Sequence, residues 1–106
     1  MAQFQAYENP NRATRDTYPY LLNIQSDLLD GLHTKAVVPL CPEHLAAPAA
    51  ISRLNPVLKL EGAQFVALIP QITGIDRKHL GRHVADLSGW RTQIVTALDV
   101  LISGEV

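Results

Sequence analysis

The chain has 106 residues, of which 47% are apolar, 18% charged and 6% aromatic, with a formal net charge of −1. This length predicts one domain over residues 1–106, and the apolar fraction excludes a disordered or fibrous chain. The balanced charge excludes broad nucleic-acid binding through a basic surface, and no apolar run reaches the roughly 18 residues of a membrane-spanning helix.

Short alternating segments open the chain. Residues 3–7 alternate weakly between polar and apolar side chains and predict a first strand, and the polar residues 8–16 predict a hairpin loop or flap. A longer strand is predicted over residues 18–29, with Leu22 and Ile24 on one face.

A turn signal at residues 30–31 precedes the next strand. Residues 34–40 predict this strand because of their β-branched side chains. Pro39 suggests an edge strand or a strand end there, since proline lacks the donor of a sheet hydrogen bond. Residues 41–51 allow one short helical turn, and Pro48 would interrupt any longer helix.

A second hairpin is expected further along. Residues 56–60 and 63–68 are compact apolar runs joined by a turn signal at residues 61–62. Residues 71–75 then predict another strand, and residues 76–86 a polar connection that carries two histidines.

The last segment changes to helical periodicity. Ser88 is a suitable N-cap, and Gly104 occupies the position of a left-handed C-cap. The apolar residues between them recur at steps of three and four, namely Trp90, Ile94, Ala97, Leu98 and Leu101. Five or six strands followed by one helix predict an α+β fold that is mainly β, a curled antiparallel sheet or small barrel capped by a C-terminal α-helix. A parallel wound sheet would need helices between its strands, for which the chain has no room.

Candidate residues for chemistry are few, because the sequence motifs of nucleotide, hydrolase and zinc-protease sites are absent. Cys41 and His44 form a C-x-x-H pair, and His79 and His83 are four residues apart, so a zinc site is conceivable. The second pair lies in a charged connector, however, and a lone cysteine beside apolar neighbours is typical of a buried side chain. We therefore predict no metal, no cofactor and no catalytic residue. The single cysteine and a first segment without a secretory signal indicate the reducing cytoplasm.

Two places carry more apolar side chains than one core needs. Leu28 and Leu29 are adjacent, so on a strand one of them would face water. On the final helix, Val95 and Ile102 lie beside the main stripe, and Val106 follows. Either these residues form an exposed partner-binding patch or the core stripe is slightly wide.

Four segments resemble the CcdB toxin family of toxin–antitoxin modules: IQSDLLDGLHTKAVVPL (residues 24–40), LNPVLKLEG (residues 54–62), VADLS (residues 84–88) and the terminal LISG. Their order and spacing match over nearly the whole chain. The resemblance implies a small SH3-like barrel with a flanking minor sheet and a C-terminal helix, assembled as a symmetric homodimer. It also implies a protein that is not an enzyme: the toxin dimer binds the A subunits of bacterial DNA gyrase and traps gyrase on cleaved DNA.

Two partner-binding surfaces follow from this resemblance. The gyrase-binding surface would combine the adjacent leucines with the end of the helix and the residues after it: Leu28, Leu29, Asp99, Ile102, Ser103, Gly104, Glu105 and Val106. The other surface would bind the disordered tail of a CcdA-like antitoxin through the flap and the outer sheet, at Asn11, Arg12 and around Phe65.

The tail departs from the family pattern. Well-known relatives end in Gly-Ile, whereas here Ser103 precedes Gly104-Glu105-Val106, which adds a carboxylate near the terminal one. Close to a two-fold axis, these charges would meet their symmetry mates at a high desolvation cost. Either the tail turns outward with Val106 in place of the terminal isoleucine, or gyrase binding is weakened.

Two alternative functions remain open. The chain could be a non-toxic relative that binds only the antitoxin. It could also be an endoribonuclease like the MazF/PemK toxins, which share the barrel. Cleavage of RNA needs a base, an acid and a cation around a phosphate, and Arg12, Arg15 and a carboxylate are the candidates for these roles.

Overall fold

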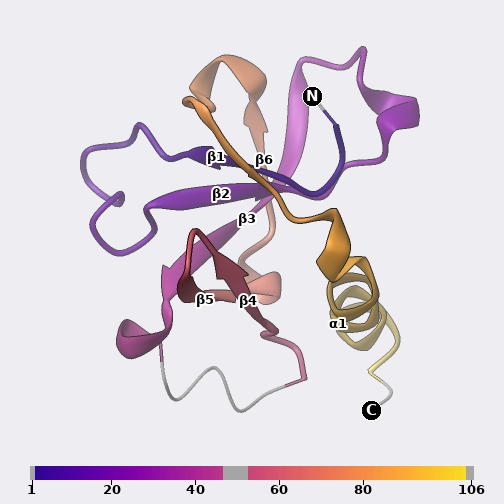
Figure 1. Cartoon of the computed structure of the whole chain (residues 1–106). Coiled ribbons are helices and arrows are strands. Elements are labelled where there is room, and N and C mark those ends of the chain that lie inside the picture. The colour runs from indigo at the N-terminus through magenta and orange to yellow at the C-terminus, as the bar shows by residue number, and fades with distance from the viewer. Residues whose placement is uncertain (1, 47–52, 105–106) are drawn as a thin grey trace.

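Figure 1 shows the computed structural model, which describes residues 2–46 and 53–104. The described strands are β1 (Gln5–Glu8), β2 (Tyr20–Asn23), β3 (Thr34–Pro42), β4 (Val57–Leu60), β5 (Ala63–Ala67), β6 (Thr73–Asp76) and β7 (His83–Asp86). The helical elements are the 3₁₀ turns η1 (Asp27–Leu29), η2 (Glu43–Leu45), η4 (Ile69–Gln71), η5 (Arg77–His79) and η6 (Ser88–Trp90), and the α-helix α1 (Arg91–Ser103). None of the described helices is long and apolar enough to cross a membrane.

The strands form one antiparallel sheet in the order β4-β5-β3-β2-β1-β7, with β6 as a side branch. The long β3 lies at the centre, because β2 pairs along one of its edges while β6 and β5 share the other. The sheet curls as a half-barrel, with α1 on one side of it (Figure 1). The predicted mainly β fold with a single C-terminal helix is confirmed. The flanking minor sheet that the resemblance implied is not separate among the described strands, because all seven belong to one sheet and β6 pairs with β3.

The main core lies between the sheet and α1. Val38 and Leu40 of β3 belong to this apolar cluster, together with Ile94 and Ala97 of the helix. Val37 belongs to a smaller cluster on the opposite face of the sheet, since successive strand residues point to opposite sides. Burial on both faces explains why β3 is apolar almost throughout.

Pro39 lies in the middle of this central strand, so the predicted edge strand or strand end at this residue is wrong. Hydrogen bonds between β2 and β3 alternate along the pair, and the nitrogen of Pro39 points away from β2. It faces the break between the two partners on the other edge, because β6 pairs only as far as Val37 and β5 begins at Leu40. The Pro39 carbonyl accepts a hydrogen bond from the Leu68 N–H at 3.1 Å. The missing donor therefore removes no sheet hydrogen bond.

The strand predicted over residues 18–29 is much shorter, because β2 ends at Asn23. Three residues later the chain turns: the Ser26 hydroxyl accepts a hydrogen bond from the Leu28 N–H at 3.2 Å and caps η1. Such a side-chain bond to a nearby amide competes with sheet pairing. Leu28 and Leu29 consequently lie on a 3₁₀ turn and not on alternating faces of a strand.

The connection predicted over residues 76–86 contains a strand that the sequence pattern did not reveal. β7 pairs with β1 and places His83 opposite Tyr7, with the two rings edge to face at 5.5 Å. The His83 ring also shares a 2.7 Å hydrogen bond with the Gln5 side chain, 78 positions away in sequence. The polar, exposed residues of β7 obscure the alternation, and only its pairing with β1 shows that it is a strand.

Two connections follow the prediction closely. The β4–β5 hairpin turns at Glu61 and Gly62, whose φ angles of 51° and 81° are those of a tight two-residue hairpin loop. The short helical turn expected after β3 is η2. Pro48, which was expected to prevent a longer helix, lies outside the described residues.

The final helix is confirmed with a different start. α1 follows directly on η6, and Ser88 is not its N-cap. The Ser88 N–H instead donates to the Asp86 carboxylate at 2.8 Å. At the other end Gly104 has a φ of 73°, and its N–H donates to the Val100 carbonyl at 2.8 Å. This is the predicted left-handed C-cap.

Candidate partner-binding surfaces

The C-terminal end of α1 is an exposed surface with an apolar side chain at its centre. We call residues 99–104 the helix end. Ile102 is 82% exposed. The Ser103 hydroxyl donates to the Asp99 carbonyl at 2.7 Å, and Gly104 closes the last turn. Ile102 is therefore presented to water on a capped, regular element.

Of the two apolar residues predicted beside the main stripe of α1, one packs in the core and the other is exposed. Val95 packs against the main core and so belongs to that stripe, whereas Ile102 does not. Asp99 is exposed beside it, as are the residues that follow. Glu105 and Val106 lie outside the described residues, so the arrangement of the tail is still a prediction.

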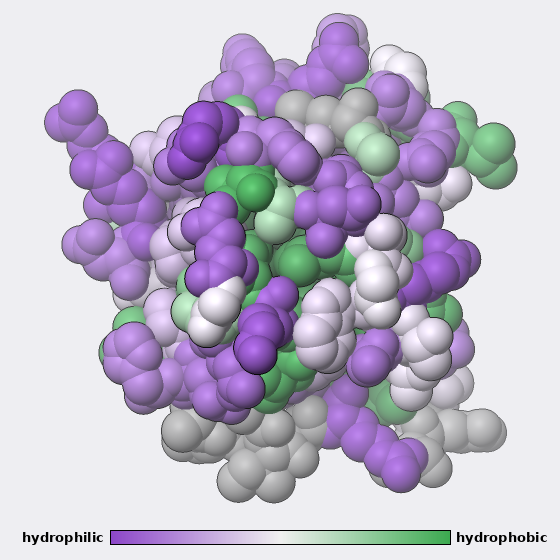
Figure 2. Space-filling view, in the orientation of Figure 1, coloured by the Kyte–Doolittle hydropathy of each residue, from purple (hydrophilic) through white to green (hydrophobic). Residues whose placement is uncertain are grey.

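A second exposed apolar group lies on the loop between β2 and β3, which we call the tip (residues 24–33). Leu28 is 94% exposed, Leu29 48% and Leu32 53%. Only one of the first two was expected to face water, and both do, because η1 is not a strand. Figure 2 shows apolar side chains at the upper right edge of the molecule, over η1.

The tip and the helix end do not form one patch within a single chain. Both lie along the right-hand edge of Figure 1, the tip at its top and the helix end at its bottom. The α-helix between them has 13 residues, which corresponds to about 20 Å at the usual rise per residue. A partner that contacts both groups must extend along this edge, or must meet them from two chains.

The predicted flap lies in the loop between β1 and β2, and we use the name flap for residues 9–18 of this loop. It is folded around a buried asparagine. Asn9 is 7% exposed, and its amide donates to the Thr14 hydroxyl at 3.0 Å and to the Tyr18 carbonyl at 2.8 Å. Its side-chain oxygen accepts from the Asn11 N–H at 3.0 Å. The flap is thus an ordered loop, and it carries Asn11 and Arg12 as exposed residues.

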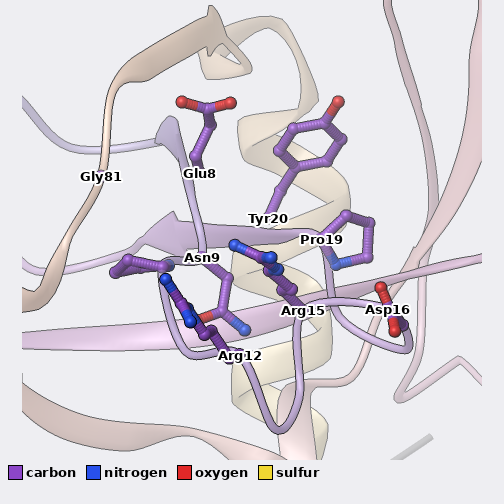
Figure 3. Close-up of a pocket in the computed structure, with 9 residues that line it drawn as sticks. Glu8, Asn9, Arg12, Arg15, Asp16, Pro19, Tyr20 and Gly81 are labelled. Atoms are coloured by element: carbon purple, nitrogen blue, oxygen red, sulfur yellow. The ribbon is translucent and has the colours of Figure 1, made fainter.

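A polar cleft of about 600 Å³ lies between the flap and the sheet. Figure 3 shows Arg12 and Arg15, which come from the flap, together with Glu8 and Tyr20, which come from β1 and β2. Glu8 also accepts a hydrogen bond from the Arg82 side chain at 3.3 Å. Because acidic and basic side chains line the cleft in equal number, their charges balance and the cleft does not favour a polyanion.

Phe65 was expected on the outer face of the sheet, but it does not lie there. It is 7% exposed, and its ring meets the Tyr20 ring edge to face at 5.3 Å inside the core. The two-residue period of β5 places Phe65 and Ala67 inward and leaves Gln64 exposed. Only part of Phe65 reaches a cavity of about 500 Å³ beside η2. The predicted outward orientation of Phe65 is therefore wrong, and its role in antitoxin binding is still a prediction.

Cys41 is a packing residue, as predicted. It is 3% exposed and lies in a small cluster with Val66 and Leu68. Burial raises the pKa of its thiol, which keeps the sulfur protonated and unreactive. His44 is exposed on η2. Within residues 2–46 and 53–104, no three His, Cys, Asp or Glu side chains gather as a metal ion would require.

Sequence reasoning missed the most buried charge of the described chain. Lys35 of β3 is 1% exposed, and its Nζ donates to the Asp30 carbonyl oxygen at 2.9 Å and to the Asp30 carboxylate at 3.1 Å. The two-residue period could have indicated this burial, because Lys35 shares a strand face with Val37. Its partner could not have been inferred that way.

A family model described as CcdB protein matches residues 3–104. No curated protein matches the chain. The matched range includes the tip, the flap and the helix end.

Proposed function

Because the chain belongs to the CcdB family, whose members are toxins of toxin–antitoxin systems, we propose that it binds the A subunit of bacterial DNA gyrase and traps gyrase on cleaved DNA. The observation that carries the proposal is the exposure of large apolar side chains on ordered elements, with Leu28 94% and Ile102 82% exposed. Such side chains mark partner surfaces when they are held in place and surrounded by polar residues.

The proposed mechanism is binding without catalysis by this chain. A toxin that binds one conformation of gyrase better than the others shifts the enzyme toward that conformation. A symmetric homodimer suits this task, since the two A subunits are themselves related by a two-fold axis. The action would take place in the cytoplasm, where the chromosome is.

The gyrase-binding surface would consist of the tip and the helix end. Its members are Leu28, Leu29, Asp99, Ile102, Ser103 and Gly104, followed by Glu105 and Val106. Since the two groups lie at opposite ends of one edge in Figure 1, gyrase would meet them as two separate contacts. Burying a leucine or isoleucine fully contributes about 1.5–3 kcal/mol, so each contact would be worth at least a tenfold change in affinity.

The test incubates the purified protein with gyrase, supercoiled plasmid and ATP, and measures linear DNA after gyrase is denatured. Linear DNA that requires both proteins is expected. Ile102→Ser and Leu28→Ser are each expected to raise the half-maximal toxin concentration at least about tenfold. Truncation after Ile102 is expected to abolish trapping while the fold stays intact. Leu45→Ser changes an exposed leucine outside both groups, and it serves as the matched control.

No linear product from the folded protein, with supercoiling unimpaired, would contradict the gyrase proposal. Binding of the antitoxin in that case would identify a non-toxic relative. Trapping by the truncated chain would instead exclude the residues after Ile102 as contacts, and the Ile102→Ser variant would then decide whether the remaining helix end contributes.

The antitoxin would bind over the flap. The cleft with Arg12 and Arg15 can accept a carboxylate, and Tyr20 and Pro19 add apolar surface to it. A disordered tail that folds on binding can cover such a broad, mixed surface. Arg12→Ala is expected to weaken binding of the antitoxin tail peptide, measured by calorimetry, whereas Arg53→Ala, at an exposed position outside the flap, serves as the control.

One observation keeps the ribonuclease alternative in view. The cleft brings Arg12, Arg15 and Glu8 together, which are the cation and carboxylate types that RNA cleavage requires. Incubation with single-stranded RNA, in parallel with the gyrase assay, separates the two functions. RNA cleavage that is lost in Arg15→Ala and Glu8→Gln, without gyrase trapping, would replace the proposal above.

A further inference from the structure

We propose that Lys35 is a positioning residue, which holds the tip in the one shape that presents Leu28 and Leu29 to a partner. The inference rests on the proposed function, in which the tip is a gyrase contact. Lys35 itself is buried under the tip and would not touch gyrase. Its effect would pass through the backbone of the leucines.

The first support is the unusual burial of a charged side chain. Lys35 is 1% exposed, and its Nζ donates to both the carbonyl oxygen and the carboxylate of Asp30, at 2.9 and 3.1 Å. Asp30 directly follows η1, so the pair fastens the end of that turn to β3. Lys35 is the buried partner of this ion pair, whereas the Asp30 side chain is 46% exposed. An ion pair with a buried member adds little stability compared with an apolar side chain of similar shape, but it favours a single arrangement of the groups around it.

The rest of the tip is fastened in the same manner. The Gln25 side chain donates to the Leu29 carbonyl at 3.2 Å and accepts from the Ala36 N–H at 3.1 Å, so it ties η1 to β3. The Asp27 carboxylate accepts from the Gln3 N–H at 2.7 Å and ties the start of η1 to the N-terminal segment. Three side chains, of which Asp27 belongs to the turn itself, thus fix a turn whose leucines face water.

This arrangement is what a binding surface needs. A loop that is already ordered loses less conformational entropy when a partner binds it. Leu28, at 94% exposed, buries almost nothing in the isolated chain. The hydrogen bonds beneath it therefore hold the shape of a turn that its own burial does not stabilise. Lys35 is the member of this group whose removal can be made without removing packing, since methionine keeps the unbranched stem.

The test compares Lys35→Met with Lys59→Met, which removes the same charge from an exposed position of β4. Three quantities are measured: the thermal midpoint, the hydrogen exchange of the Leu29, Asp30 and Leu32 amides, and trapping of gyrase. In Lys35→Met the midpoint is expected to be unchanged or higher. Exchange of the tip amides is expected to accelerate at least about tenfold, and the half-maximal toxin concentration to rise by a similar factor. Lys59→Met is expected to leave all three unchanged.

Unchanged exchange at the tip amides in Lys35→Met would overturn the proposal, whatever the gyrase assay shows. Faster exchange with full trapping would overturn it as well, because the held shape would then not matter for binding. If the wild-type protein fails to trap gyrase, the proposed function fails, whereas exchange still decides whether Lys35 orders the tip. Should Lys35→Met not fold, Asp30→Asn takes its place, with faster exchange expected at the same amides. Leu28→Ser, which is expected to lose trapping while exchange stays slow, separates contact from positioning.

Discussion

At the scale of single residues, buried polar side chains determine the shape of the loops. Lys35 holds the tip, Asn9 holds the flap, and Asn23 donates to the Ala2 carbonyl at 3.0 Å and so fixes the N-terminal segment. Each has hydrogen-bond partners, as burial of a polar group requires. The exposed residues proposed to bind other proteins are therefore held in place by buried residues that would not contact those proteins.

Gly81 is a residue whose lack of a side chain is required. A Cβ at this position would lie 2.7 Å from the backbone oxygen of Glu8, whereas a Cβ at Gly89 would meet nothing within 4 Å. We expect Gly81→Ala to lower the free energy of unfolding by about 1–3 kcal/mol, because β1 must shift. Gly89→Ala serves as the control in urea unfolding, and equal stability of the two variants would contradict the argument.

Asp86 gives the turn before α1 a dependence on pH. Its pKa lies below the ordinary value, chiefly because its carboxylate accepts a hydrogen bond from the Ser88 backbone N–H. A lowered folded-state pKa means that ionised Asp86 stabilises the fold above the ordinary value near 4, and that this contribution is lost as pH falls through the folded-state pKa. The difference in unfolding free energy between wild type and Asp86→Asn should therefore shrink as the pH falls from 7 to 2. A difference that stays constant over this range would disprove this origin.

At the scale of elements, α1 has two roles on different parts of its surface. Ile94 and Ala97 are fully buried against the sheet, while Ile102 extends into water at the end of the helix. The left-handed Gly104 stops the helix directly after this exposed turn. The same periodicity that packs the helix therefore also determines what its last turn presents.

Substitutions on the two parts of α1 are expected to affect folding stability and partner binding separately. Ile94→Ala is expected to cost about 2–5 kcal/mol of unfolding free energy, because it leaves a cavity in the main core. Ile102→Ala is expected to change stability by less than about 0.5 kcal/mol, as exposed positions usually do. Chemical denaturation of both variants provides the measurement. A large loss of stability in Ile102→Ala would show that this side chain packs in a way that its 82% exposure does not suggest.

At the scale of the whole molecule, the order of the strands joins the two ends of the sequence. β7 pairs with β1 at the edge of the sheet, and the chain runs on from β7 through η6 to α1. This pairing leaves the tip and the helix end along one edge, with the flap at the opposite side of the view in Figure 1. The proposed gyrase and antitoxin surfaces therefore lie on different sides of one chain.

A homodimer is the expected form in solution. Light scattering coupled to size-exclusion chromatography should give twice the chain mass of 11.6 kDa at micromolar concentration. The two-fold proposal requires this state. A monomer at the concentrations that trap gyrase would exclude a preformed symmetric toxin.

The sequence alone determined the elements that depend on neighbouring residues. The β4–β5 hairpin, the final helix with its Gly104 cap and the buried Cys41 all follow from local spacing and composition. The resemblance to the CcdB family was likewise visible in contiguous segments such as residues 24–40. These features were predictable because turn chemistry and amphipathic periodicity act over a few residues.

Only the tertiary structure decided the features that depend on distant partners. β7 becomes a strand through β1, Pro39 is tolerated in a central strand because two partners meet beside it, and Phe65 points inward because of the face that the curled sheet buries. Lys35 is buried because the tip folds back over it. A sequence pattern records which side chains alternate, whereas the choice of the face to bury, and of the groups that meet there, depends on contacts between residues far apart in the chain.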